Sequence, residues 1–457
     1  MNTSDKRKIK PLNQWVRGCL SIGALWLSVV ASPVQAEDLL DLYRSALESD
    51  PRLGSATYDH AAGAEVLPQA WAGYRPVVTL DYDYIDTSQD VLSSDNAAFA
   101  QGGASFPTHT WTLSVTQPIF RWANYKRIGQ AKEELLQADA ELIQAEQDLI
   151  LRVSEAYLGA LSAADELRFL DAERNAVAKQ LELARGRELA SIGRAVDRYD
   201  AEARMASVDA DYAVAEVALR DAYEALYEMA GRDPQALATL QDDIDLQSPQ
   251  PADDQYWIEA AMRNNPALVV QRHVVNVSRT EISRQNAGHY PTLDAVLRKN
   301  NRDTGGTLFG GGSEVETEEL MLRLSVPLYA GGAVSSKTRE AQARYQSSEQ
   351  ELTRLLRESR RQSRDAYWGV MNAVKRTQAL NKAVAAQQAT LDLRRAAYKS
   401  RLETAISVLD AERDLYSAKR DLARAKYDYL LNSLRLKALV GVLTQDDLNL
   451  VNDWLQS

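Results

Sequence analysis

The sequence predicts an α+β protein, mostly α-helical, in which one structural unit is used twice. Each half of the 457-residue chain carries the same short motifs in the same order. Each half also contains runs in which apolar and polar residues alternate, followed by a long stretch without proline that is rich in Ala, Leu, Glu and Arg. Alternation is typical of β-strands, and those residue types favour helices. We therefore expect each unit to join a β-hairpin to long coiled-coil helices.

The repeated motifs indicate that a whole domain is duplicated. They are Asp50-Pro51-x-Leu53 with Asn265-Pro266-x-Leu268, Gly73-x-x-Pro76 with Gly288-x-x-Pro291, and Asp200-Ala201-Glu202 with Asp410-Ala411-Glu412. Motifs this far apart indicate a duplicated domain rather than a short solenoid unit. We expect the first structural repeat at residues 37–250 and the second at residues 251–457.

The first 36 residues are predicted to be a secretory signal peptide. Basic residues precede an apolar stretch at residues 20–30, and Val34-Gln35-Ala36 forms a small-x-small cleavage site. The apolar stretch is too short for a comfortable membrane span, and a retained signal anchor is the alternative. The only cysteine, Cys19, lies in this segment, so the mature chain is expected to have no disulfide.

Composition argues against nucleic-acid binding and against catalysis. The full chain has a formal charge of −11, and loss of the basic signal peptide would make it more acidic, whereas nucleic-acid binding needs basic patches. The four histidines show no metal-ligand spacing, and the glycines at residues 310–312 are not followed by the Lys-Ser/Thr of a phosphate-binding loop. We therefore expect no enzyme activity, no cofactor and no metal.

Each half is expected to begin with short helices. The first of these is predicted at residues 39–47 in one half and at residues 257–262 in the other. An Asp-Pro or Asn-Pro pair follows, and proline suits the first turn of a new helix. That second helix is expected to end before Gly73 or Gly288.

Two strands of about ten residues are expected next in each half. Alternation covers residues 78–84, 111–116, 292–298 and 320–326, and polar loops are expected at residues 87–105 and 300–313. The second strand of each half is expected to end at a proline, Pro118 or Pro327. Because proline removes a ladder donor, these two residues would mark strand–helix joints.

The proline-free stretches predict helices of unusual length. A helix over residues 123–189 would be roughly 100 Å long at about 1.5 Å per residue. It is expected to break near residues 191–194 and to return at residues 197–230, and the second half breaks near residues 400–404. Each half is therefore also a helical hairpin that points away from its β-hairpin. No globular core is that thick, so the helices would form a free coiled coil or the wall of a long assembly.

Four strands in one chain cannot close a barrel by themselves, and they leave unpaired edges. Their apolar residues, such as Tyr82, Tyr84, Trp111 and Leu113, could pack on helices of the same chain. Alternatively, several subunits could each donate four strands to one shared barrel, with these side chains facing lipid. Strands of about ten tilted residues match the thickness of a membrane.

The chain resembles the TolC-like outer-membrane efflux and type I secretion ducts from residue 37 to about residue 450. The resemblance is carried by Asp50-Pro51, Asn265-Pro266, Gly331-Gly332, the joints at residues 117–120 and 326–329, and the segment at residues 408–430. It implies a homotrimer with a 12-stranded β-barrel in the outer membrane and an α-helical tunnel in the periplasm. It also implies a passive channel that is docked by an inner-membrane pump and a periplasmic adaptor (membrane fusion) protein. The alternative is a soluble periplasmic coiled-coil scaffold or adaptor.

The resemblance further implies a gate at the periplasmic tip, where the long helices reverse direction. It places a gate tyrosine at Tyr398, a gate aspartate at Asp197 and an inner ring aspartate at Asp410. Glu403 stands where the family's gate has an arginine, and Ser407 stands where it has an outer ring aspartate. Arg401, Arg194 or Arg198 could supply the missing cation.

Threefold symmetry would turn each acid that faces the tunnel into a ring of like charges. The acids at the tips are Asp197, Asp200, Glu403 and Asp410. Such rings raise the affinity for cations and resist closure by mutual repulsion. The alternative is that these charges belong to ordinary solvated helix turns.

Overall fold

The computed structural model describes residues 36–93, 102–234, 236–241, 244, 246–306 and 311–456. Contacts divide the chain into two units, residues 1–35 and residues 36–457, and the described helices and strands all belong to the second unit. The predicted signal peptide therefore lies, except for Ala36, outside the described residues. Part of the loop expected at residues 87–105 and part of the one expected at residues 300–313 also lie outside them.

The short helices lie where the sequence predicts them. In the first half they are α1 (Leu39–Ser49), α2 (Pro51–Ala64) and α3 (Val66–Ala72), and in the second they are α6 (Asp254–Asn264), α7 (Pro266–Asn286) and the 3₁₀ turn η2 (Ala287–His289). Asp50 and Asn265 cap α2 and α7 by accepting backbone N–H groups at 2.7 and 3.0 Å. The helix expected to run unbroken to Ala72 is divided at Glu65. The break places Pro68 in the first turn of α3, where its missing N–H is not needed.

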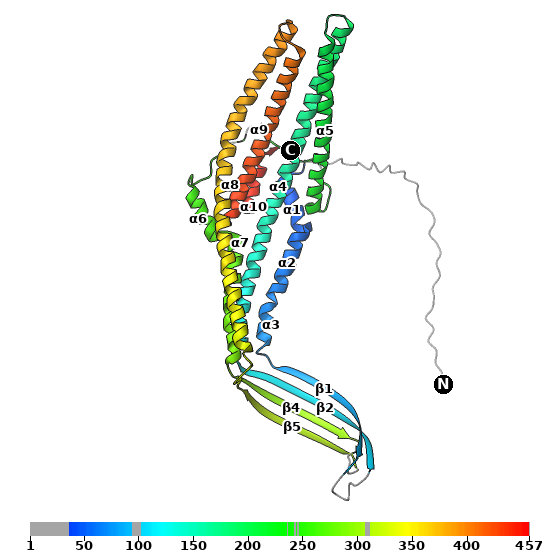
Figure 1. Cartoon of the computed structure of the whole chain (residues 1–457), viewed down its shortest axis with the longest axis vertical. Coiled ribbons are helices and arrows are strands. Elements are labelled where there is room, and N and C mark those ends of the chain that lie inside the picture. Colours follow the sequence, from blue (N-terminus) through cyan, green and yellow to red (C-terminus); the bar gives the residue numbers. More distant parts are fainter. Residues whose placement is uncertain are drawn as a thin grey trace, which may run out of the picture. The chain divides into compact units, whose positions relative to one another are not determined.

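The four long strands form one antiparallel sheet in the order β1-β2-β4-β5 (Figure 1). The strands are β1 (Val77–Val91), β2 (Gly102–Arg121), β4 (Thr292–Thr304) and β5 (Ser313–Ser325). They contain 15, 20, 13 and 13 residues, so the prediction of about ten residues each was too short. Pairs such as Ser88 with Ser105 extend the ladder into the expected loops. Polar residues on both faces leave no alternation there, although the backbone pairing continues.

The two prolines lie near the ends of their strands, but only the second-half strand, β5, ends before its proline. β2 passes through Pro118 and ends at Arg121, with a shift in register between Pro118 and Phe120, so the predicted end was three residues early. Pairing with β1 stops at Thr116, so β2 has one free side at this point. Proline is tolerated at such an edge or irregularity. In the second half β5 ends at Ser325, and Pro327 lies in the link that leads to the next helix at Ala333.

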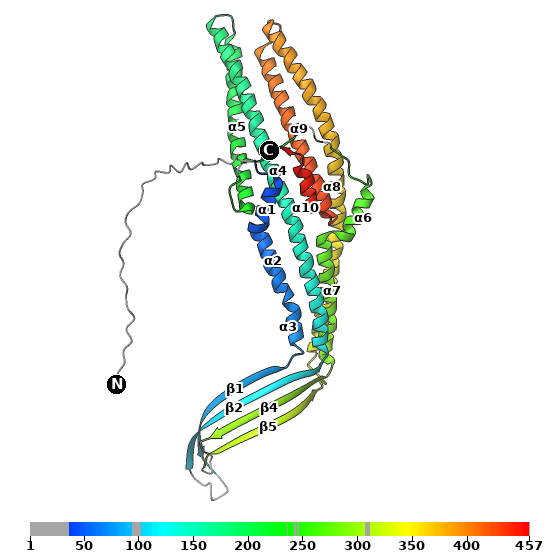
Figure 2. The same cartoon turned by 180° about the vertical axis from the view of Figure 1, so that it is seen from behind.

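Two helical hairpins extend from the sheet, as predicted. The first is α4 (Trp122–Leu189) with α5 (Ala195–Ala230), and the second is α8 (Ala333–Lys399) with α9 (Ala405–Leu439). Helix α4 starts directly after β2 and leads away from the sheet. The tips of both hairpins lie at the end of the helices that is away from the sheet (Figures 1 and 2). Each tip turns through a residue with positive φ, Ser191 at 58° and Arg401 at 63°. No described helix combines the length and the apolar character that a membrane crossing requires.

The main core lies midway along the helices. Large side chains of α4, α1 and α9, including Tyr157, Leu149, Leu42 and Leu430, are fully or almost fully buried there. The helix α10 (Gln445–Asn452) and a two-stranded sheet, β3 (Thr239–Leu240) with β6 (Leu455–Gln456), complete this region. This core holds the two hairpins together midway along their length. The tips are held together by other contacts, which lie near the turns.

Candidate functional site

The two hairpins meet along α9, which packs against both α4 and α5. Near the tips, Leu409 of α9 lies in an apolar cluster with Val177 of α4 and with Ala201 and Val208 of α5. All four side chains are buried. The second hairpin also has an apolar cluster formed by its own helices, which contains Leu391, Tyr398, Ala405, Val408, Ala411 and Leu415. The second hairpin is therefore packed internally as a unit and contacts the first along a narrower line.

Tyr398, the residue at the expected gate tyrosine, joins the two hairpins. It lies near the end of α8, and only 9% of it is exposed. The guanidinium of Arg187 on α4 lies over its ring, 4.4 Å from the centroid. This geometry is that of a cation–π interaction. The structure thus places Arg187 beside Tyr398, an arrangement that the sequence did not suggest.

The three arginines considered as substitute cations lie elsewhere in the tips. Arg194 pairs with Asp197, three residues along its own turn, at 3.0 Å. Arg198 pairs with Glu188 and Glu202 at 2.7 and 2.8 Å, and Arg401 is the positive-φ residue of the second turn. Hydrogen bonds from Arg185 and Arg198 lower the pKa of Glu202. This carboxylate therefore stays charged within the first hairpin.

The predicted acids lie at the tips, where helix α5 or α9 begins. Asp197 and Asp200 lie in the first two turns of α5, and both are partly buried. Glu403 is exposed in the second turn, and Asp410 of α9 pairs with Arg413 at 3.5 Å. The tips therefore carry acids on both hairpins, and Asp197 and Asp410 each have an arginine on their own hairpin.

Ser407 helps to begin α9 and to join it to α8. Its hydroxyl donates to the carbonyl of Thr404 at 2.8 Å, and its own carbonyl accepts from Arg394 of α8 at 2.9 Å. The predicted position of an outer ring aspartate is thus occupied by a residue with a structural contact inside the second hairpin.

A buried charged cluster lies farther from the tips, and sequence reasoning missed it. Glu173 of α4 has a side chain that is only 1% exposed. It pairs with Arg204 of α5 and, at 3.2 Å, with Arg420 of α9. A sequence signal exists, because Glu173 interrupts an otherwise largely apolar series of buried α4 positions at helical spacing. The series is Leu170, Glu173, Val177, Gln180 and Ala184.

More polar contacts join α4 to α9 toward the core. Tyr427 donates to Asp165 at 2.8 Å, and Arg435 pairs with Glu155 at 2.7 Å. Burial, followed by the negative charge of Asp165, raises the pKa of Tyr427 above that of a free tyrosine. Tyr427 therefore stays neutral at ordinary pH and acts as a hydrogen-bond donor.

One face of the four-stranded sheet is exposed and largely apolar. The apolar residues that share this face by register are Val78, Leu80, Tyr82, Tyr84, Trp111, Leu113, Leu297, Leu320, Leu322 and Leu324. Farther from the helices, Lys299 of β4 and Glu316 and Glu318 of β5 lie on the same face and form ion pairs. Leu320 is 80% exposed and Tyr84 is 58% exposed. The opposite face carries polar residues such as Asp81, Thr112 and Asn300. β1 and β5 lie at the two edges of the sheet.

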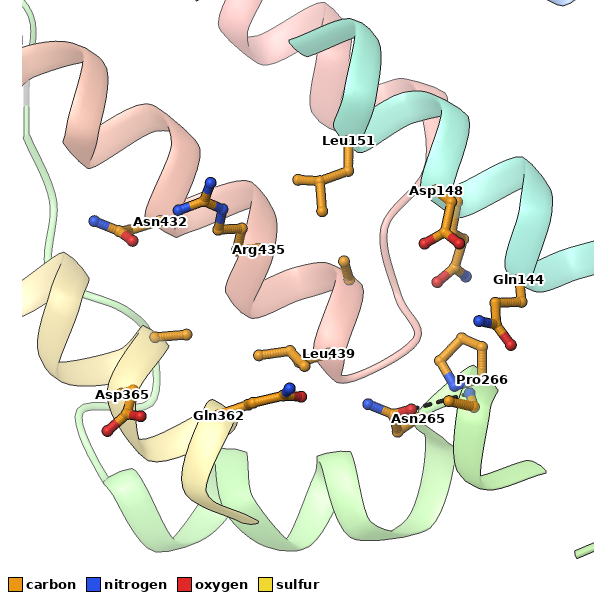
Figure 3. A pocket seen from close by; sticks show the side chains of 14 residues that line it. Gln144, Asp148, Leu151, Asn265, Pro266, Gln362, Asp365, Asn432, Arg435 and Leu439 are labelled. Atoms are coloured by element: carbon orange, nitrogen blue, oxygen red, sulfur yellow. Dashed lines mark hydrogen bonds between the residues drawn. The ribbon is translucent and has the colours of Figure 1, made fainter. Parts of the chain in front are cut away.

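A cavity of about 500 Å³ lies beside the core, where the second repeat begins. It is lined by α4, by the start of α7, by α8 and by α9, and Figure 3 shows Gln362 and Leu439 turned toward Asn265. The residues at the matching position of the first repeat have different charges. There Arg152 of α4 pairs with the capping residue Asp50 at 2.8 Å, whereas the second repeat has the neutral Gln362 and Asn265.

Comparisons with known proteins agree with this architecture. The outer membrane protein TolC of Vibrio cholerae serotype O1 is 30% identical over 433 residues, which cover 94% of this chain and 96% of that protein. The proteases secretion protein PrtF of Dickeya chrysanthemi is 31% identical over 438 residues, which cover 94% of each chain. The CmeC outer membrane channel of Campylobacter jejuni shares the fold with a TM-score of 0.77 at 12% identity, over 92% of this chain and 90% of that one.

A family model described as outer membrane efflux protein matches residues 42–232 and 257–442. The two matched segments fall in the two halves that carry the repeated motifs, and together they span more than half of the chain. The chain therefore belongs to the outer membrane efflux protein family.

Proposed function

We propose that this family member is one subunit of a homotrimeric export duct that is closed at rest at its hairpin tips. Membership of the family makes the chain an outer-membrane efflux or type I secretion protein. The alternative of a soluble periplasmic scaffold or adaptor is not favoured by that membership. The family and its relatives are transport channels, so the tunnel would act by conducting cargo rather than by chemistry.

The observation that carries this proposal is the open sheet. It has two free edges and an exposed apolar face, and soluble proteins usually avoid this combination. If β5 of one subunit pairs with β1 of the next, three copies close a barrel of twelve strands. The apolar face then contacts lipid and the polar face lines the interior. Each of the four long strands has at least 13 residues, which exceeds the roughly ten that a tilted strand needs to cross the hydrocarbon core.

The helices would then continue the barrel as a tunnel wall. α4 contains 68 residues and α8 contains 67, so each is roughly 100 Å long at about 1.5 Å per residue. The phenolic ring of Tyr398 and the guanidinium of Arg187 would hold the two hairpins together at the far end. Rings of Asp197 and Asp410 would line the narrow part and attract cations, with Asp200 and Glu403 adding negative charge beside them.

Docking partners would act on the same tips. We propose a periplasmic adaptor and an inner-membrane pump, because a duct that performs no chemistry needs another component to supply energy. The exposed apolar residues Leu189, Ile192 and Leu402 at the turns would offer contact surface to the adaptor. The cargo, whether small toxic compounds or unfolded proteins, would be chosen mainly by the pump.

The test is to image detergent-purified mature protein as single particles and to measure its conductance in planar lipid bilayers. The expected result is a particle with threefold symmetry, a membrane-embedded end and a long tunnel, together with a small resting conductance. A monomer that remains in solution without detergent would contradict the proposal. So would a trimer whose sheet packs on its own helices.

A further inference from the structure

We propose that Glu173 is a positioning residue for the closed duct. It fastens the second helical hairpin to the first through Arg204 and Arg420. The inference rests on the proposed function, because it assigns a role in keeping the tips of a duct together. These three residues form the Glu173 cluster.

The two oxygens of the Glu173 carboxylate contact different helices. Oε1 accepts from Arg204, which lies on α5 in the same hairpin as Glu173. Oε2 accepts from Arg420 at 3.2 Å, and Arg420 lies on α9 in the other hairpin. Arg420 also pairs with Glu166 of α4 at 3.3 Å. A single buried carboxylate therefore connects three helices and both hairpins.

Because Glu173 is the acid between two arginines, its loss and the loss of Arg420 are expected to have different effects on the contact between the hairpins. With Glu173 in place, its negative charge lies between two guanidinium groups. Without that charge, Arg204 and Arg420 remain as two like charges in a poorly solvated place, with Glu166 as the remaining acidic partner of Arg420, and their repulsion favours movement of α9 away from α5. Loss of Arg420 is different, because Glu173 keeps its contact with Arg204 inside the first hairpin. The second hairpin then loses one of its contacts with the first but is not repelled.

The position of the Glu173 cluster makes it suited to this role. Toward the tips, the hairpins are joined by the Leu409 cluster and by the stacking of Arg187 on Tyr398. Toward the core, Arg435 and Glu155 join the same two helices, α9 and α4. Glu173 lies between these levels, and the second hairpin beyond it is packed as its own apolar unit. Separation of the tips therefore requires Arg420 to leave Glu173.

The experiment measures the distance between the two tips directly. Leu189 and Leu402 lie beside the two turns and are 87% and 82% exposed. They are replaced by cysteines that carry spin labels, with Cys19 replaced as well so that no other thiol is present. Pulsed electron–electron double resonance on detergent-purified protein then gives the distribution of distances between the spin labels at the two tips. The labelled variants Glu173→Gln, Arg420→Gln and Arg174→Gln are compared with the labelled parent.

Arg174→Gln is the matched control. Arg174 is the next residue on α4, and it pairs with Asp209 of α5 at 2.7 Å, within the first hairpin. We expect Glu173→Gln to move a large share of the distribution to longer distances and Arg420→Gln to move a smaller share. Arg174→Gln is expected to match the parent. A merely structural role would lower the stability of the protein without moving the two tips apart, so the distance distribution is the readout that separates the two roles. Mean conductance in planar bilayers is expected to rise severalfold in the same order.

The readouts separate this proposal from the proposed function. A trimeric, conducting protein in which Glu173→Gln and Arg174→Gln give the same distances would overturn the role of Glu173 alone. Protein that is neither trimeric nor conducting would overturn the duct and, with it, the role in gating. If Glu173→Gln does not fold, Arg420→Gln decides the matter, because it leaves the contact between Glu173 and Arg204 intact. An Arg420→Gln distribution equal to that of the control would then refute the proposal.

Discussion

Arg152 of α4 donates to both carboxylate oxygens of Asp50, the residue that caps α2, at 2.8 and 3.1 Å. The side chain of Asp50 is 2% exposed and also accepts the N–H of Leu53. In the second repeat, Asn265 caps α7 by accepting the N–H of Ala267, but Gln362 stands at the position that matches Arg152. The duplicated unit therefore keeps the cap in both halves and keeps the ion pair in only one.

Removal of the cap is expected to cost more in the first repeat than in the second. Asp50→Ala removes a helix cap and leaves Arg152 without its partner, for a loss of about 3 kcal/mol. Asn265→Ala removes only a cap, for a loss of about 1 kcal/mol. Urea unfolding followed by far-ultraviolet circular dichroism would measure both, and Asp50→Asn should fall between them. Equal losses for Asp50→Ala and Asn265→Ala would show that the ion pair contributes nothing.

The same ion pair predicts a response to acid. Burial alone would raise the pKa of Asp50, but the hydrogen bonds from Arg152 and Leu53 outweigh burial and lower it overall. A lowered pKa in the folded state adds stability above the unfolded pKa of about 3.9, and that stability is lost as the pH falls through the folded value. The stability difference between the parent and Asp50→Asn should therefore be constant above about pH 5 and shrink in stronger acid. Unfolding curves at a series of pH values would test this, and a difference that grows in acid would contradict it.

The contact between Tyr427 and Asp165 predicts the opposite trend at high pH. Tyr427→Phe removes a donor from Asp165 and should cost about 1 kcal/mol at neutral pH. The pKa of Tyr427 is raised in the folded state, so its contribution is complete below the unfolded pKa of about 10 and is lost as the pH rises above it. Thermal unfolding at neutral pH and above about pH 10 should show the two proteins converging. Tyr223→Phe, which changes another tyrosine of raised pKa in the core region, is a suitable comparison.

The helices were predictable because residues that start or end helices, mainly proline and glycine, lie near many of their ends. The start of α4 at Trp122 and the turns at residues 191–194 and 400–404 agree with the sequence prediction to within a few residues. Strand length was underestimated because pairs such as Ser88 with Ser105 are polar on a solvated stretch, where alternation disappears. The paired strands were expected in outline, whereas the register that pairs β2 with β4 depends on the packing of both repeats.

The contacts between the two hairpins could not be predicted from the sequence. Arg187 and Tyr398 belong to different repeats, and no local spacing relates a guanidinium on one helix to a ring on another. Glu173 was overlooked for a different reason. A glutamate in a long helix usually lies on the solvated face, and only its place in the apolar series indicates burial. The tip acids Asp197 and Asp410 remain predictions as gate residues, since their ion pairs with nearby arginines fit both a gate and a solvated turn.

Stacking of Arg187 on Tyr398 predicts which tip substitutions open the duct. Tyr398→Phe keeps a ring beneath the guanidinium and should stay closed, whereas Tyr398→Ala and Arg187→Gln should not. A cation–π interaction of about 1 kcal/mol corresponds to roughly a fivefold change in the closed-to-open ratio of one subunit. Mean conductance in planar bilayers would measure the effect. If Tyr398→Phe opens the duct as far as Tyr398→Ala, the hydroxyl rather than the ring holds the tip closed.

Asp410 is expected to form part of a cation-binding ring in the closed tip. Asp410→Asn removes one negative charge from each subunit, so three charges leave the constriction of a trimer, and multivalent cations should block the current less strongly. The half-blocking concentration of a trivalent cation, measured on single channels, should rise severalfold. Asp209→Asn is the control, because it removes the same charge from α5 at a distance from the tip, where Asp209 pairs with Arg174. An equal change in both variants would reflect the net charge of the tunnel, and an unchanged block in Asp410→Asn would remove Asp410 from the constriction.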